Sequence, residues 1–192
     1  MKHIILLGDS IRISYESFVR ETLADDAMIY APDENCKFAQ YLLRHAHDWK
    51  HKNQWPTDAD LVHWNAGLWD VLELYEDGPL TTLTHYEELI SRIDRRLRRL
   101  FPHAKMVFAT STAVLDDGFS QNCKRSNAVI EQYNAAALRA LSQTDTVIND
   151  LYALTRTCPP SYYTDATHPR TPEAIPVVGG QVVEVIRREL GL

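Results

Sequence analysis

Three polar side chains in this sequence have the types and spacing needed for acyl transfer. Ser10 directly follows the first apolar run of the chain, in the segment "ILLGDSIRIS". Asp165 and His168 lie near the other end, in "YTDATHP", with two residues between them. A serine hydroxyl becomes nucleophilic when a histidine takes its proton, and an acid bonded to the second ring nitrogen orients that histidine. The three residue types therefore point to nucleophilic attack on a carbonyl carbon.

Each of these motifs also has a simpler structural interpretation. A serine after Gly8 and Asp9 at the start of a helix is often a capping residue. Asp165 could form an Asx-type turn before Pro169, with a new helix beginning near Thr171 and Pro172. Taken separately, neither motif decides between structure and catalysis.

A developing oxyanion would need hydrogen-bond donors beside the serine. Asn65, in "HWNAGLWD", follows an apolar run, and its side-chain amide could donate together with the backbone N–H of Ser10. The alternative is an Asn-x-Gly turn that ends at Gly67. Aromatic residues nearby, Trp69 and Tyr75, could form the wall of a pocket.

Alternating strand-like and helical segments predict how these residues are positioned. Short apolar, β-branched runs occupy residues 4–7, 27–31, 61–64, 105–110 and 146–151, and helical spacing of apolar residues occurs over 13–23, 38–49, 86–100, 127–141 and 172–190. This order predicts an α/β protein, a three-layer α/β/α sandwich around a flavodoxin-like five-stranded parallel sheet. Ligands of such sheets bind beyond the carboxyl ends of the strands, where Ser10 and Asn65 fall.

The sequence resembles the SGNH hydrolase superfamily, the GDSL esterases and lipases, over residues 6 to 169. The resemblance rests on "LLGDSI", on part of "WNAGL" and on "DATHP", which occur in the family's order. It implies the SGNH hydrolase fold and a serine-dependent acyl ester hydrolase. In that family Ser10 would be the nucleophile, His168 its base and Asp165 the acid, and Asn65 would be an oxyanion donor.

Two blocks depart from the family pattern. The third block usually reads Gly-x-Asn-Asp, but His63, Asn65 and Ala66 stand here in place of its Gly, Asn and Asp. The second block usually provides a glycine whose backbone N–H completes the oxyanion hole, but the segment "APDENCKFA" has no glycine. Asn35 is the best positional match, because asparagine tolerates unusual backbone angles and its N–H needs no glycine. The expected oxyanion hole therefore consists of Ser10, Asn35 and Asn65.

Composition restricts the other functions that the chain could have. A length of 192 residues with 45% hydrophobic content predicts a single domain over 1–192. The net charge of -6 argues against a nucleic-acid partner, and the basic run from Arg95 to Arg99 fits a solvated helix face. Three cysteines without framework spacing, a short first apolar run and no membrane-length stretch predict a cytoplasmic protein with free thiols.

No cofactor or metal is expected. His45, His47 and His51 cluster in one helical segment, but no glutamate lies where a zincin motif requires one, so a surface cluster is favoured. Cys36 is expected to be a small buried residue rather than a reactive thiol.

The leading hypothesis is an esterase acting on small-molecule esters, with short loops favouring small soluble ones such as acetylated carbohydrates. Two rival hypotheses remain, one motivated by the two sequence blocks that depart from the family pattern and the other by the possibility that an acceptor other than water takes the acyl group. One is a degenerate hydrolase scaffold that serves as a carbohydrate- or lipid-binding module, and the other is an acyltransferase. The oligomeric state, the acyl group and the alcohol do not follow from the sequence.

Overall fold

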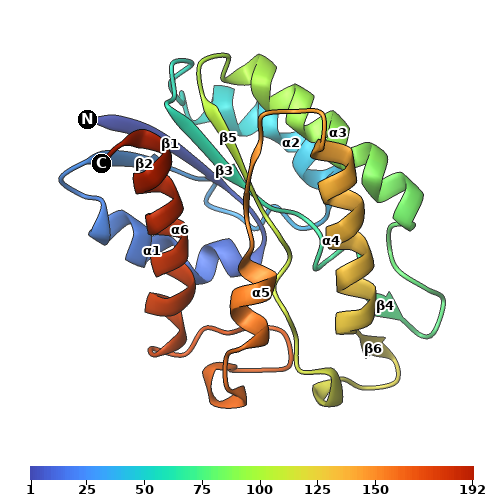
Figure 1. The fold of residues 1–192 in the computed structure, drawn as a ribbon. Helices are drawn as coiled ribbons and strands as arrows, with labels where there is room; N and C mark the ends of the chain where they lie inside the picture. Colours follow the sequence, from blue (N-terminus) through green and yellow to red (C-terminus); the bar gives the residue numbers. More distant parts are fainter.

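A five-stranded parallel sheet forms the centre of the computed structural model, which describes residues 1–192 (Figure 1). The strand order is β2-β1-β3-β5-β7, and every neighbouring pair is parallel. The strands are β1 (Lys2–Leu7), β2 (Ala27–Tyr30), β3 (Leu61–Trp64), β5 (Lys105–Ala109) and β7 (Val147–Asn149). The flavodoxin-like order predicted from the sequence is confirmed.

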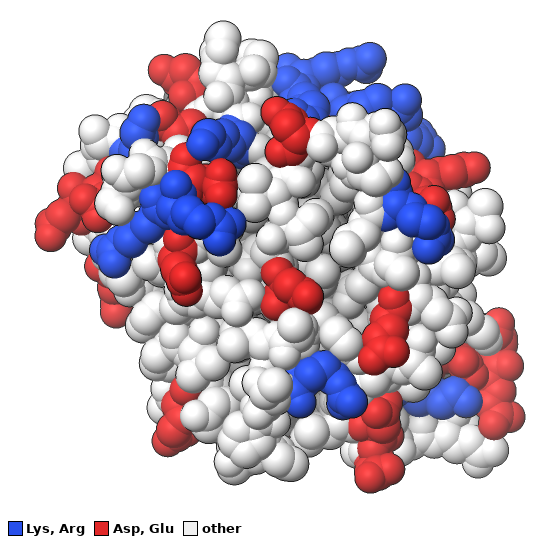
Figure 2. All heavy atoms as spheres, in the orientation of Figure 1, with Lys and Arg blue, Asp and Glu red and all other residues white.

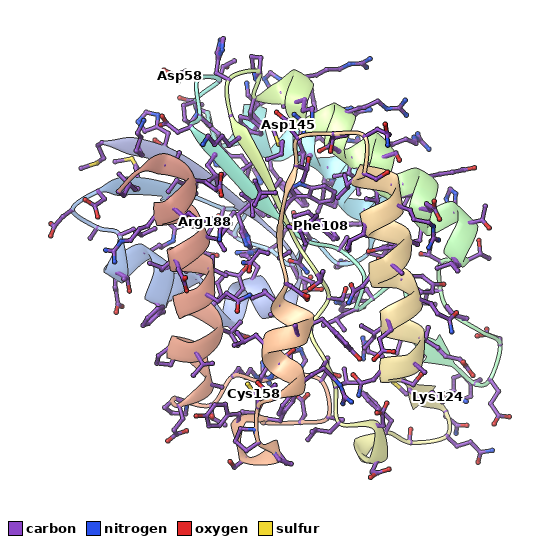
Figure 3. All side chains as sticks on the ribbon, in the orientation of Figure 1. Asp58, Phe108, Lys124, Asp145, Cys158 and Arg188 are labelled. Atoms are coloured by element: carbon purple, nitrogen blue, oxygen red, sulfur yellow. The ribbon has the colours of Figure 1, made fainter.

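The inner strands are buried on both faces, which explains their continuous apolar sequence. All of β3 and the last four residues of β1 are buried. Alternation of polar and apolar residues would place polar side chains under the covering helices, so parallel sheets use unbroken runs instead. Phe108, near the middle of the sheet in Figure 3, meets Trp64 edge-on with ring centroids 4.8 Å apart. Trp64 is therefore a core residue and not part of a pocket rim.

Helices cover both faces of the sheet. They are α1 (Ser10–Thr22), α2 (Ala39–Lys52), α3 (Leu83–Leu100), α4 (Asn127–Leu141), α5 (Leu151–Arg156) and α6 (Ala174–Leu190). Helices α1 and α6 pack against each other on one face, and α2, α3 and α4 form a row on the other (Figure 1). The three-layer architecture is thus the predicted one. Each long helix buries one apolar stripe, as an amphipathic helix on a sheet must.

Several boundaries differ from the sequence-based ones. The first helix begins at Ser10 rather than residue 13, because Asp9 caps it. The last strand is shorter than predicted, since Asp150 caps α5 and ends the extended segment. The periodic patterns cannot show these limits because caps lie outside the repeating apolar positions.

A second, two-stranded sheet was not predicted. Strands β4 (Glu73–Leu74) and β6 (Cys123–Lys124) pair antiparallel and join the segment after β3 to the segment before α4. We call this pair the β4–β6 ribbon. Short 3-10 helices also occur at Asp116–Gly118 and Pro160–Tyr162.

The surface mixes both charge signs. Acidic and basic side chains are interspersed over the face in Figure 2, with groups of basic side chains at the upper right and at the left. The arginine run of α3 contributes Arg92, Arg95, Arg96 and Arg99 along one side of that helix. None of the helices combines the length and the apolar character that crossing a bilayer requires.

Candidate active site

Ser10 is the first residue of α1, at the carboxyl end of β1. The side chain of Asp9 accepts a hydrogen bond from the Ile11 N–H at 2.9 Å, so Asp9 rather than Ser10 caps the helix. The Ser10 N–H has no hydrogen-bond partner within the protein, as expected in the first turn of a helix. Ser10 as a whole is half-buried.

The hydroxyl of Ser10 meets the imidazole of His168. The distance from Ser10 Oγ to His168 Nε2 is 2.7 Å, and His168 Nδ1 lies 2.8 Å from both carboxylate oxygens of Asp165. A neutral imidazole that donates from Nδ1 to Asp165 has an unprotonated Nε2 that accepts from Ser10. The structure thus brings these three side chains into one hydrogen-bonded chain across 158 positions of sequence.

A tight turn holds Asp165 against His168. Asp165 Oδ1 also accepts hydrogen bonds from the N–H groups of Thr167 and His168, at 2.8 and 3.0 Å. The Asx-type turn offered as the simpler interpretation is therefore present, and it positions the same carboxylate that bonds the imidazole. Structural and catalytic interpretations of this motif are compatible.

The pKa values of two carboxyl groups near Ser10 are shifted in opposite directions from their usual values. Burial raises the pKa of Asp165, but hydrogen bonds from the Thr167 N–H and from His168 outweigh it, so its net pKa is lowered. Burial raises the pKa of Asp9 above its usual value, although hydrogen bonds from the Ile11 N–H and from the Asn65 side chain oppose this shift. Asp165 therefore stays ionised into acidic solution, where it can stabilise a positive imidazole.

Asn65 leaves β3 directly beside the Gly8–Ser10 turn. Its backbone N–H donates to Leu7 O at 3.1 Å, which continues the ladder between β3 and β1. Its side chain covers Gly8 so closely that a Cβ at residue 8 would lie 2.0 Å from Asn65 Oδ1. A glycine is needed at residue 8 because of this approach.

The loop carrying Asn35 is fixed on both sides of that residue. On one side, Arg12 Nη2 donates to Glu34 O at 2.6 Å. On the other, Cys36 donates its N–H to Gly8 O at 3.0 Å, and its sulfur accepts from the Gly8 N–H at 3.3 Å. The Asn35 N–H between these anchors has no partner in the protein.

The left-handed residue in this loop is Lys37 rather than Asn35. Lys37 has a φ of 51°, and its N–H donates to Asn35 Oδ1 at 2.7 Å. Asn35 therefore does not use the unusual backbone angles that an asparagine tolerates. The asparagine contributes an Asx turn to the loop instead.

The Glu34 carboxylate adds a further anchor that sequence reasoning missed. It accepts from Trp49 Nε1 at 2.7 Å and from the Tyr41 hydroxyl at 2.8 Å, both on α2. These hydrogen bonds lower the pKa of Glu34. Spacing on α2 places Trp49 two turns after Tyr41, but nothing in the sequence links that face to Glu34.

Two buried titratable residues near these loops do not belong to the hydrogen-bonded chain. His63 is fully buried, its pKa is lowered to about 4 by burial, and its Nε2 lies 3.1 Å from Asn149 Nδ2. Asp70 is also buried, and it accepts from the Ala39 N–H at the start of α2 and from the Thr81 hydroxyl at 2.8 Å. Burial raises the pKa of Asp70 to about 7.

The remaining predicted features take no part in the hydrogen-bonded chain of Ser10, His168 and Asp165. Cys36 is buried as expected, and burial raises the pKa of its thiol to about 12. The histidines of α2 lie at the surface, where Asp48 is near His45 and His47. Tyr75 is exposed and has a φ of 52°, so it forms no buried pocket wall.

The main cavities of the molecule do not include Ser10 or His168. One cavity of about 510 Å³ is lined by Leu115, Asp116, Arg156 and neighbouring residues. It lies near the His168 loop, because the Leu115 N–H donates to Ala166 O at 2.8 Å. Ser10 and His168 are both half-buried.

Neither a family model nor a curated protein matches this sequence, whereas its structure matches many solved ones. A lipase/acylhydrolase from Enterococcus faecalis superposes with a TM-score of 0.77 at 15% identity, covering 98% of this chain and 96% of that one. The acetyl xylan esterase AlAXEase gives 0.74 at 16% identity, covering 96% and 99%. A GDSL-like lipase from Bacteroides thetaiotaomicron gives 0.73 at 14% identity, covering 97% and 88%. The chain therefore has the fold of the GDSL-like lipases and acylhydrolases, which is the fold that its resemblance to the SGNH hydrolases implied.

Proposed function

We propose that this protein is a serine-dependent carboxylic ester hydrolase, with one catalytic domain over residues 1–192. The observation that carries the proposal is the hydrogen-bonded chain from Ser10 Oγ through the His168 ring to Asp165. The fold shared with GDSL-like lipases and acylhydrolases supports the same reaction type. The three unpaired cysteines fit a cytoplasmic location.

In the proposed reaction His168 Nε2 takes the proton of Ser10 as Oγ attacks the ester carbonyl. Asp165 keeps the Nδ1 proton in place and stabilises the imidazolium that forms. The imidazolium then gives its proton to the leaving alcohol oxygen as the C–O bond breaks, leaving an acyl-serine. Water, deprotonated by the same ring, attacks this ester and releases the acid, which restores the Ser10 hydroxyl.

Three groups are proposed to hold the oxyanion. The free N–H groups of Ser10 and Asn35 provide two backbone donors, and the side-chain amide of Asn65 provides the third. The anchors on Glu34 and Cys36 support the role of Asn35, because a donor fixed before the reaction needs no reorganisation during it. The loop without glycine can thus supply the N–H that the second family block provides.

Small soluble esters such as acetylated carbohydrates are the proposed substrates. The fold similarity to an acetyl xylan esterase supports this choice. The rival interpretations, a carbohydrate- or lipid-binding module and an acyltransferase, make different predictions in the same experiment.

The test compares wild type with Ser10→Ala on a chain-length series of p-nitrophenyl esters and on acetylated sugars. Wild type should release p-nitrophenol and react with a phosphonate inhibitor, whereas Ser10→Ala should do neither. Unchanged turnover or labelling of the variant would refute the role of Ser10. Saturable sugar or lipid binding without hydrolysis would favour the binding module, and acyl products formed with added alcohols would favour a transferase.

A further inference from the structure

Arg125 lies between the loop after β3 and the loop that carries His168. Its Nε donates to Leu68 O at 2.5 Å, and its Nη1 lies 3.4 Å from Thr167 Oγ1. Leu68 follows Asn65 by three positions, and Thr167 immediately precedes His168. The guanidinium therefore contacts the residue next to His168, and its charge acts on Asp9 and Asp165.

The charge of Arg125 has no direct counter-ion. The residue is half-buried, its guanidinium forms no ion pair, and Nη2 has no partner within the protein. Asp9 and Asp165 act on it only from a longer distance, and burial lowers its pKa. Asp165 is already engaged by His168, and Arg170 lies 3.5 Å from its second oxygen. A partly desolvated cation with an unused donor is favourably placed to bind an anion.

The position of Arg125 is fixed by its neighbours in the chain. It directly follows the β4–β6 ribbon, in which Lys124 pairs with Glu73, and it precedes Ser126, the cap of α4. Lys124 and Cys158 mark the lower end of the molecule in Figure 3, where the loops after the strands gather. The bond from Nε to Leu68 O in turn holds the guanidinium, and a donor held before binding lowers the entropic cost of binding a ligand.

We propose that Arg125 forms an anion subsite of the proposed esterase and selects ester substrates that carry a carboxylate close to the scissile bond. This inference rests on the proposed function, because the subsite selects substrates only if the protein is an esterase. The planar fork of arginine suits a carboxylate because two N–H groups can face its two oxygens. Nη2 supplies one donor, and Nη1 can supply the second by giving up its long contact with Thr167.

The experiment compares a neutral ester, p-nitrophenyl acetate, with an anionic one, mono-4-nitrophenyl succinate. Wild type should have the higher kcat/KM for the anionic ester. Arg125→Gln should lower this preference about tenfold or more, mainly through KM, while its kcat/KM for the neutral ester stays close to wild type. The control is Arg156→Gln, because Arg156 is an exposed arginine without an ion pair, and this variant should keep the preference.

A purely structural role for Arg125 gives a different result, in which Arg125→Gln lowers both activities in parallel. That result, or a wild type without preference for the anionic ester, would overturn the proposal. Calorimetric titration of succinate into Ser10→Ala and into Ser10→Ala/Arg125→Gln provides a readout that does not need turnover. If succinate binding depends on Arg125 but wild type hydrolyses no ester, the proposed esterase is refuted and the anion subsite is retained. If wild type hydrolyses esters but succinate binding does not depend on Arg125, the anion subsite is refuted and the proposed esterase is retained.

Discussion

Gly8→Ala provides a direct test of the proposed role of Asn65, because the two residues are in contact. The new Cβ would lie 2.0 Å from Asn65 Oδ1 and 2.8 Å from Arg12 Cβ. The asparagine side chain is the more mobile neighbour, so we expect it to move out of its position. Loss of one oxyanion donor lowers kcat by ~100- to 1,000-fold. KM should change little, because the donor acts chiefly in the transition state.

Hydrolysis of p-nitrophenyl acetate by wild type, Gly8→Ala, Asn65→Ala and the double variant forms the assay. If Gly8→Ala acts by displacing Asn65, the double variant should be little slower than either single one. Thermal unfolding separates this effect from overpacking, which costs about 1–3 kcal/mol of stability. Gly180→Ala is the control, since its Cβ would meet nothing within 4 Å. A folded Gly8→Ala protein with wild-type kcat, or losses that multiply in the double variant, would refute the reasoning.

Two further predictions concern the surroundings of the site. Trp49→Phe removes the indole N–H that bonds Glu34 and keeps most of the ring, so we expect a several-fold fall in kcat with the fold retained. Trp55→Phe, at another buried tryptophan, is the control. An unchanged kcat in Trp49→Phe would contradict a role of Trp49 in positioning the Asn35 loop. Asp70→Asn should weaken the dependence of folding stability on pH. The pKa of Asp70 is about 7 in the folded protein and 3.8 for an ordinary aspartate, so the folded state binds more protons than the unfolded state between these values. Wild type should therefore lose stability as the pH rises through that window. Urea unfolding at pH 5 and pH 7 measures this difference, and an identical change in both proteins would count against it.

The sheet could be predicted because local signals carry it, whereas the contacts among Ser10, His168 and Asp165 were expected from the resemblance to the SGNH hydrolases. Each strand is an unbroken apolar run, and the order of strands and helices limits the topology to few choices. The carboxyl ends of parallel strands lie at one edge of the sheet, which places Ser10 there, but topology alone does not bring the segment around His168 to it, because α5 lies between β7 and that segment. Their catalytic roles stay predictions until the substitutions above are made.

The supports of the site could not be predicted because they depend on contacts between distant segments. The β4–β6 ribbon has two residues in each strand, too few for any periodicity. Asp70 bonds the start of α2 from 31 positions away, and Arg12 reaches the Glu34 carbonyl from a helix on the other face of the sheet. Such pairs have no fixed spacing in the sequence, and only the packed chain brings them together.

The separation of Ser10 from His168 has a consequence for the order in which the chain matures. A contact between residues 158 positions apart belongs to the non-local part of the fold, whose loop-closure entropy makes it slow to form. During synthesis the serine leaves the ribosome early, and the imidazole follows only when most of the chain has been made. A nascent chain therefore lacks the hydrogen bond between Ser10 and His168 until the segment around His168 has been made and has folded back onto the start of α1.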